Sequence, residues 1–266
     1  MSTSQKLDKL LDKKGKKYYE VLAKSISKTS TEPSISALLK KYSYKLAALS
    51  GLLFEYVHED CGKISCGSIG VGMIALSVSP HDDLTDERPS DPAAFVHAGD
   101  VLMGEGFRIF AEECHDSRNF LRAFKTLSSH TNRMWEFQQK DTKFFARKKI
   151  SLNEYFEIIG KSREWAKIGL VPAAILCGKK TNDYIKIGGC IGNIFQVLDD
   201  ITEVEEDKGK YCSYFSCNLD GVGLEKAKDA ARKMIDKERQ SLSKLLLTKP
   251  KLRDFGLRLM EITKNI

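Results

Sequence analysis

Two short clusters of acidic residues carry the clearest chemical signal in this sequence. The first, in the run HDDLTDE, contains Asp82, Asp83 and Asp86, and the second, in the run FQVLDDITEVEED, contains Asp199, Asp200, Glu203 and Asp207. Carboxylates three or four residues apart on a helix project from one face, so each cluster can direct several oxygens at one point. Proteins hold Mg²⁺ with a few carboxylates together with water and phosphate oxygens. Two such clusters facing each other would form a cage for Mg²⁺ and a diphosphate.

The composition predicts one all-α domain. The chain has 266 residues, of which 42% are hydrophobic and 6 are proline, and this is enough apolar surface for a substantial core. The apolar residues recur mainly with helical periodicity, and alternating Val, Ile and Thr runs bounded by hairpin turns are few. We therefore expect a single domain over residues 1–266 without an internal repeat.

The positive charge of the chain, +7 at neutral pH, is concentrated near the N-terminus. Residues 1–30 predict a basic amphipathic helix followed by a Ser/Thr/Pro loop. Such a helix could contact a membrane or a nucleic acid, but a solvated surface helix is the simpler interpretation, and no nucleic-acid motif supports the alternative. Whether this helix covers the site is left open by the sequence.

The sequence also favours a cytoplasmic protein. Its N-terminal segment lacks the apolar core and the cleavage site of a signal peptide, and the longest apolar run, residues 168–177, is too short to span a bilayer and contains Pro172. The 7 cysteines are an odd number without a CxxC pair, which favours reduced thiols. We therefore expect a soluble, intracellular protein.

Helical periodicity, interrupted by Pro, Gly and Ser/Thr breakers, divides the chain into segments. After a first helix that ends near Ile26, the pattern predicts helices over residues 36–56, 69–86, 93–114, 117–145, 152–176, 182–205, 224–247 and 252–264. The first acidic cluster then lies at the end of the helix over residues 69–86, and the second lies near the end of the helix over residues 182–205. The fold must bring these two distant helix ends together.

The two clusters and the residues between them resemble the trans-isoprenyl diphosphate synthase (polyprenyl synthetase) family. The resemblance rests on HDDLTDE paired with GNIFQVLDDITEVEEDKGK. Further matches follow in the family's order: Ala98, Gly99 and Asp100 for its AGD, Gln138 and Asp141 for its QxxD, Lys161 in EYFEIIGKS, and Gly209 and Lys210 for its GK. The resemblance covers residues 69–266, and its motifs are specific because FQxxDD together with a distant DDxxD rarely arises by chance.

The resemblance implies an isoprenoid synthase fold, an all-α bundle around a central cavity with the acidic clusters at its mouth. It implies the catalytic residues Asp82, Asp83, Asp86, Asp199, Asp200 and Glu203. Ligands for Mg²⁺, about three ions with diphosphate bound, would be Asp82, Asp86, Asp199, Glu203 and Asp207. Lys161, Gln196 and Lys210 would bind an allylic isoprenyl diphosphate. Cations placed there stabilise the charge that develops as the allylic C–O bond breaks. The family is usually dimeric, which implies a homodimer.

The sequence departs from the family at the site for the second substrate, isopentenyl diphosphate. Chain-elongating members carry a GGKRLRP-like stretch and an RRG-like pair there, whereas this chain offers only Lys45, with Lys40 or Lys41, and Arg88. Arginine and lysine are not interchangeable as phosphate clamps. The asymmetry favours a class I terpene synthase, which ionises an allylic diphosphate without isopentenyl diphosphate. Alternatives are chain elongation at a rearranged site that uses these basic residues, transfer to another acceptor, and a non-catalytic partner subunit of a prenyl synthase.

Side chains that line the cavity would limit the length of the substrate's tail. In the family, large aromatic residues four and five positions before the first motif stop chains short, and here Val78 and Ser77 occupy these positions. Their small size favours a C15 or C20 tail, although both could equally pack between helices. Further wall candidates are Met73, Leu76, Phe107 and Phe110. His81 is interpreted as support for the adjacent motif, and Trp135 and Trp165 as core residues.

Overall fold

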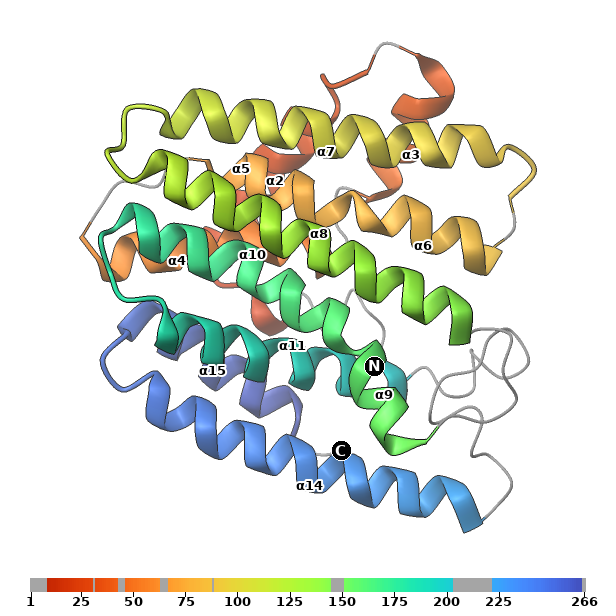
Figure 1. The fold of residues 1–266 in the computed structure, drawn as a ribbon, viewed down its shortest axis with the longest axis vertical. Helices are drawn as coiled ribbons and strands as arrows, with labels where there is room; N and C mark the ends of the chain where they lie inside the picture. Colours follow the sequence, from red (N-terminus) through yellow and green to blue (C-terminus); the bar gives the residue numbers. More distant parts are fainter. Residues whose placement is uncertain are drawn as a thin grey trace.

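The computed structural model describes residues 9–30, 32–42, 46–62, 67–87, 89–144, 151–202 and 222–264. Every regular element within these ranges is a helix (Figure 1), which confirms the all-α prediction. The elements are α2 (Lys13–Ile26), α3 (Pro33–Tyr42), the 3₁₀ helix η1 (Leu46–Ala48), α4 (Leu49–Asp60), α5 (Ser68–Leu76), α6 (Val78–Glu87), α7 (Pro92–Cys114), α8 (Phe120–Phe144), α9 (Leu152–Ile158), α10 (Gly160–Leu176), α11 (Asn182–Thr202), α14 (Val222–Leu245) and α15 (Pro250–Ile262). None of these helices is long and apolar enough to cross a bilayer.

The long helices form a bundle with α10 at its centre. In Figure 1, α7, α8, α10, α11 and α14 lie roughly parallel or antiparallel, one below another. α10 packs against α8, α11 and α4, while α5 packs against α7. α6, α8 and α11 end toward the right-hand side of this view, and α10 begins there. The bundle therefore brings the ends of α6 and α11, which carry the two acidic clusters, to the same end of the molecule.

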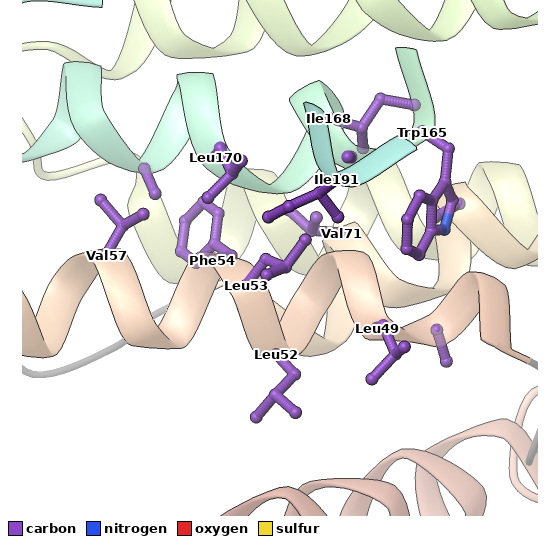
Figure 2. Close-up of a cluster of buried hydrophobic side chains, with 14 of the residues drawn as sticks. Leu49, Leu52, Leu53, Phe54, Val57, Val71, Trp165, Ile168, Leu170 and Ile191 are labelled. Atoms are coloured by element: carbon purple, nitrogen blue, oxygen red, sulfur yellow. The ribbon is translucent and has the colours of Figure 1, made fainter. Parts of the chain in front are cut away.

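The helix α4 lies within the core because it is apolar on nearly every side. Of residues 49–57, only Glu55 is not fully buried. Figure 2 shows Phe54 directed toward Leu170 of α10, and Leu52 directed to the opposite side of the helix. A helix that is apolar all round is a buried helix, and burial of each large aliphatic or aromatic side chain stabilises the fold by about 1.5–3 kcal/mol. α4 thus forms a support against which α10 is fixed.

The predicted helix over residues 36–56 is wrong, because α3 and α4 are separated by η1. Side chains from other helices bind the backbone at this break. Trp165 Nε1 donates to Ala47 O at 2.6 Å, and the Tyr18 hydroxyl donates to Ala48 O at 3.0 Å. These two bonds tie η1 to α10 and to α2.

Pro80 divides the predicted helix over residues 69–86 into α5 and α6. A proline has no amide hydrogen, so the carbonyl of Leu76, four residues earlier, loses its helical partner. α5 accordingly ends at Leu76, and α6 begins after Ser77. The break sets the direction in which α6 carries the first acidic cluster.

The predicted helix over residues 152–176 also divides, into α9 and α10. α9 starts with a capping box: the Ser151 hydroxyl accepts from the Glu154 amide at 3.2 Å, and the Glu154 carboxylate accepts from the Ser151 amide at 2.7 Å. These reciprocal bonds define the first turn. The short helix then places Tyr155 against α11, where its hydroxyl donates to Asp200.

A buried ion cluster joins α8 to α10. Glu164 of α10 is 1% exposed and accepts hydrogen bonds from His130 Nδ1 at 2.6 Å and from Lys167 Nζ at 2.8 Å, with Arg133 Nη2 at 3.7 Å. Burial opposes the ionisation of Glu164, but the bonds from His130 and Lys167 outweigh it and lower its pKa to about 2. Because His130 and Arg133 belong to α8, the cluster fixes α8 against α10.

Replacing Glu164 by glutamine is expected to lower the free energy of unfolding by about 1–3 kcal/mol at neutral pH, because the largely buried His130 and Lys167 lose the carboxylate that accepts their hydrogen bonds. A carboxyl group with a lowered pKa stabilises the fold above its ordinary pKa of 4.5 and loses this effect as the pH falls toward about 2. In urea denaturation, the difference between wild type and E164Q should therefore shrink below pH 4.5. Glu157→Gln, at a side chain that is 61% exposed, is the matched control. Equal losses of unfolding free energy in E164Q and E157Q would contradict the stabilising role assigned to Glu164.

Candidate active site

A cavity of about 150 Å³ lies between α6, α8, α10 and α11, and Ala47 of η1 also lines it. Its polar wall residues are Ser79, Asp82, Lys161, Ser162, Gln196 and Asp199, and its apolar wall residues are Ala47, Val78, Met134, Trp165 and Phe195. One member of each acidic cluster, Asp82 and Asp199, therefore faces the same space. The cavity combines charged groups with an apolar wall, as a site for an amphiphilic ligand requires.

Lys161 is the centre of the polar wall. Its ammonium donates to Oδ2 and Oδ1 of Asp82 at 3.1 and 3.2 Å, to Asp141 Oδ2 at 2.6 Å and to Gln138 Oε1 at 3.0 Å. Gln138 Nε2 also donates to Asp82 Oδ1 at 2.6 Å. Burial disfavours the charged ammonium, but Asp141 and Asp82 outweigh it and raise the pKa of Lys161. Lys161 is thus a cation at neutral pH that links α6, α8 and α10.

The two described aspartates of the second acidic cluster are divided between the cavity and the protein interior. Asp199 lines the cavity, whereas Asp200 accepts from the Tyr155 hydroxyl at 2.7 Å and from Gln196 Nε2 at 2.8 Å. The Ser162 hydroxyl in turn donates to Gln196 Oε1. Burial raises the pKa of Asp200 to about 7, although the bonds from Tyr155 and Gln196 oppose the shift. Asp200 therefore fixes Gln196 and α9, while Asp199 is placed for ligands.

The first cluster divides in the same way. Asp82 points into the cavity, and Asp83, about 100° farther round α6, accepts from Lys41 Nζ at 3.0 Å and from the Tyr42 hydroxyl at 2.9 Å. Lys41 Nζ also lies 5.8 Å from the centroid of the Phe95 ring. Asp83 thus brings the end of α3, with Lys41, next to the acidic cluster.

His81 of α6 packs against α7 and α8. Its ring lies edge to face with Trp135 at 4.8 Å between centroids, and Nε2 lies 3.8 Å from Asp100 Oδ1. Burial lowers the pKa of His81, and Asp100 opposes this shift. A Cβ added at Gly99 would lie 2.2 Å from His81 Nε2. The AGD sequence therefore provides the space and the polar neighbour that hold the first motif against α7.

Five of the predicted site residues lie outside the described residues: Lys45, Arg88, Glu203, Asp207 and Lys210. Asp86 lies in α6, but its side chain is not among those described. Lys40, at the end of α3, is exposed. The roles predicted for these residues stay predictions.

The predicted tail-lining residues are only partly brought together. Val78 lines the cavity. Ser77 is fully buried, and its hydroxyl donates to Ile74 O at 2.7 Å, so in this structure it packs within the α5–α6 junction. Phe110 packs in the core against Phe54, at 6.1 Å between ring centroids. Met73 and Leu76 are also fully buried in the core.

Trp165 and Met134 are wall residues that sequence reasoning did not find. Trp165 was expected to be a plain core residue; it is buried, but it also lines the cavity. Its position four residues after Lys161 is the signal that could have indicated this, since residues four apart share a helix face. No sequence signal marks Met134 or Ala47, because their place in the wall depends on how α8 and η1 pack.

The donor atoms at the cavity suit Mg²⁺ in kind. Asp82 and Asp199 offer carboxylate oxygens from two helices, and hard cations prefer such ligands. Among the described side chains, no three acidic, histidine or cysteine groups are gathered closely enough to hold an ion. The Lys161 ammonium contacts both oxygens of Asp82. A Mg²⁺ ion at Asp82 would therefore have to displace Lys161 from that carboxylate.

Comparison with known proteins agrees with this geometry. The profile of the polyprenyl synthetase family matches residues 81–212, a stretch that includes both acidic clusters, Gln138 and Lys161. The chain belongs, over these residues, to the polyprenyl synthetase family. This confirms the family that the paired motifs indicated.

Two curated relatives are similar to the chain. Geranylgeranyl diphosphate synthase of Methanosarcina mazei is 25% identical over 177 residues, which is 60% of this chain. Short chain isoprenyl diphosphate synthase of Methanothermobacter thermautotrophicus is 28% identical over 194 residues, which is 67% of this chain. The chain spans only 55% and 58% of the length of these two relatives.

Solved structures show the same fold. A geranyltranstransferase from Thermotoga maritima superposes with a TM-score of 0.72 at 19% identity, covering 94% of this chain and 96% of that one. The geranylgeranyl pyrophosphate synthetase from the archaeon Geoglobus acetivorans gives a TM-score of 0.72 at 19% identity, covering 92% of this chain and 99% of that one. The predicted isoprenoid synthase bundle is therefore confirmed.

Replacing Lys161 by glutamine is expected to lower the free energy of unfolding by about 1–3 kcal/mol at pH 7, because Asp82 and Asp141 then face each other without their cation. Burial already raises the pKa of Asp141, and loss of the ammonium raises it further. A carboxyl group with a raised pKa destabilises the fold at high pH, where it is ionised. The loss of unfolding free energy in K161Q should therefore shrink as the pH is lowered and Asp141 becomes protonated. Urea denaturation measured over a pH series tests this prediction.

Lys140→Gln is the matched control, since Lys140 lies on α8 with a side chain that is 50% exposed. The K140Q variant should lose no more than about 0.5 kcal/mol of unfolding free energy, and this loss should not depend on pH. A K161Q protein as stable as wild type at every pH would show that the Lys161 cluster does not hold the three helices.

Proposed function

We propose that this chain is a Mg²⁺-dependent isoprenyl diphosphate synthase, which ionises an allylic isoprenyl diphosphate and joins it to isopentenyl diphosphate. The observation that carries the proposal is the cavity wall, in which Asp82, Lys161 and Asp199 lie beside the apolar Val78 and Phe195. Such a wall fits a ligand with a diphosphate head and a hydrocarbon tail.

The names of the relatives support chain elongation over the terpene synthase that the sequence favoured. The curated relatives are named geranylgeranyl diphosphate synthase and short chain isoprenyl diphosphate synthase. The preference for a terpene synthase rested on the reduced set of basic residues for isopentenyl diphosphate. Lys41, one member of that set, contacts Asp83 at the first acidic cluster, which supports a rearranged site over a lost one. The name of the first relative supports a C15 allylic substrate and a C20 product.

In the proposed reaction, the bond between the allylic carbon and the diphosphate oxygen breaks, and its electron pair leaves with the diphosphate. The double bond of isopentenyl diphosphate then forms the new carbon–carbon bond, and a proton is lost to the released diphosphate. Mg²⁺, when bound at Asp82 and Asp199, would neutralise part of the leaving group's charge. The apolar wall excludes water, which would otherwise trap the allylic cation as an alcohol.

Lys161 has two successive roles in this proposal. Without a ligand, its ammonium is bound by Asp82 and Asp141. With diphosphate bound, it donates to the diphosphate oxygens while Asp141 keeps it in place, and Asp82 becomes available as a ligand. The interaction with the leaving group strengthens as its charge develops, so it lowers the barrier selectively.

The test is an assay with geranyl, farnesyl and geranylgeranyl diphosphates, each with and without isopentenyl diphosphate, in Mg²⁺ or in EDTA. We expect farnesyl diphosphate to give a C20 diphosphate only when isopentenyl diphosphate and Mg²⁺ are present. An Asp82→Asn, Asp199→Asn double variant should lose this activity. Hydrocarbons or alcohols from the allylic diphosphate alone would overturn elongation in favour of a terpene synthase, and no turnover in any arm would favour a non-catalytic partner subunit.

Replacing Lys41 by alanine is expected to raise the KM for isopentenyl diphosphate by about tenfold with a smaller effect on the KM for the allylic substrate, because loss of one phosphate contact costs about 1.4 kcal/mol. Lys40→Ala is the matched control, since Lys40 projects about 100° away on the same helix. Steady-state kinetics with each substrate varied in turn measures the effect. Equal effects on both KM values, or equal effects in both variants, would contradict the assignment.

A homodimer, a cytoplasmic location and a single domain over residues 1–266 remain parts of this proposal. The residues 93–110 of α7 are the stretch from which we expect the dimer contact.

A further inference from the structure

The apolar end of the cavity is formed by two aromatic side chains from different helices. Trp165 of α10 and Phe195 of α11 lie edge to face, with ring centroids 5.4 Å apart and planes at 79°. Each is 7% exposed, and both line the cavity. The edge-to-face arrangement is a favourable one for aromatic pairs, so the two rings support each other as one wall.

Trp165 is held at both its side chain and its backbone. Its Nε1 donates to Ala47 O at 2.6 Å, and its carbonyl accepts from the Ser50 hydroxyl at 2.7 Å. Moving the indole away would leave a buried donor without a partner, which costs about 1–3 kcal/mol. The indole is therefore a fixed wall.

The wall lies close to the charged end of the cavity. Trp165 follows Lys161 by four residues on α10, and Phe195 precedes Asp199 by four residues on α11. Four residues of helix rise about 6 Å. A cavity of about 150 Å³ is comparable to one that holds a benzene molecule, so it holds about one five-carbon unit next to the charged groups. The C15 tail of the proposed substrate is longer than this and therefore has to extend past Trp165 and Phe195.

The remaining apolar wall residues differ from Trp165 in what they can do. Ala47 and Val78 are small, and removing atoms from them would add little volume. Met134 is unbranched and can change rotamer to admit a ligand. Trp165 is both the largest wall residue and the one tied by a hydrogen bond to its side chain, so it limits the space most strictly.

We propose that Trp165, supported by Phe195, sets the length of the isoprenoid tail that the cavity accepts. This inference rests on the proposed function and names its specificity-determining residues. It places the length limit on α10 and α11, rather than on Ser77 just before the first acidic cluster, whose hydroxyl is bonded to Ile74 O. Val78, the residue after Ser77, contributes only a small side chain to the wall.

The experiment compares the lengths of the diphosphate products of wild type, W165L, F195L and W165F, with farnesyl diphosphate and excess isopentenyl diphosphate as substrates. W165L and F195L should lengthen the longest main product by at least one five-carbon unit, because each removes part of the wall. W165F keeps an aromatic ring and should shift the product less than W165L. Phe107→Leu is the matched control, since Phe107 packs against the core outside the cavity lining. Its ring centroid lies 5.5 Å from that of Phe124.

Unchanged product lengths in active W165L and F195L proteins would overturn the inference while leaving the proposed function intact. Absence of turnover in wild type would instead overturn the proposed function. In that case, or where a variant is inactive, binding of unreactive thiolodiphosphate analogues with C10, C15 and C20 tails still tests the wall. The ratio of the Kd for the C10 analogue to that for the C20 analogue should rise by about tenfold in W165L relative to wild type, and an unchanged ratio would overturn the inference.

Discussion

The candidate site depends on the ion pairs that the buried ammonium of Lys161 forms with two aspartates. The ammonium is bound by Asp82 of α6 and by Asp141 of α8, so one cation of α10 fixes three helices where the first acidic cluster meets the cavity. An isolated charge in this position would be strongly unfavourable, and so would two neighbouring carboxylates without a cation. Lys161, Asp82 and Asp141 can therefore stay charged and buried only as a group. In the proposed function, a diphosphate with its metal ions would replace this set of paired charges by another.

This arrangement requires helices that pack unusually close to α10. A Cβ added at Gly192 of α11 would lie 2.3 Å from Ser162 O, and one added at Gly169 would lie 2.1 Å from Ser50 O of α4. Backbones can approach this closely only where a side chain is absent. The first approach brings Gln196 to Ser162 beside Lys161, and the second brings α4 and Ala47 to Trp165. Close packing on both sides of α10 thus builds the polar and the apolar walls of one cavity.

The fold and the site differ in how firmly the sequence fixes them. Fold similarity persists at 19% identity to the Thermotoga maritima structure, because a helical bundle needs only apolar faces of suitable size and period. The site depends on individual atoms. Asp199 and Asp200 are neighbours of the same type, yet one lines the cavity and the other is bound by Tyr155 and Gln196. Such differences follow from the direction of each side chain around its helix.

The sequence by itself determined the all-α class, most helix positions, the two acidic clusters and the family, because periodicity and motif spacing are local properties of the chain. It predicted continuous helices where Pro80 and the η1 segment interrupt them, and it assigned Trp165 to the core alone. Only the tertiary structure decided that Trp165 bonds to Ala47, 118 residues away in sequence, and that Lys41 reaches Asp83. These contacts form between helices whose relative placement results from packing of the whole core, so no local pattern encodes them.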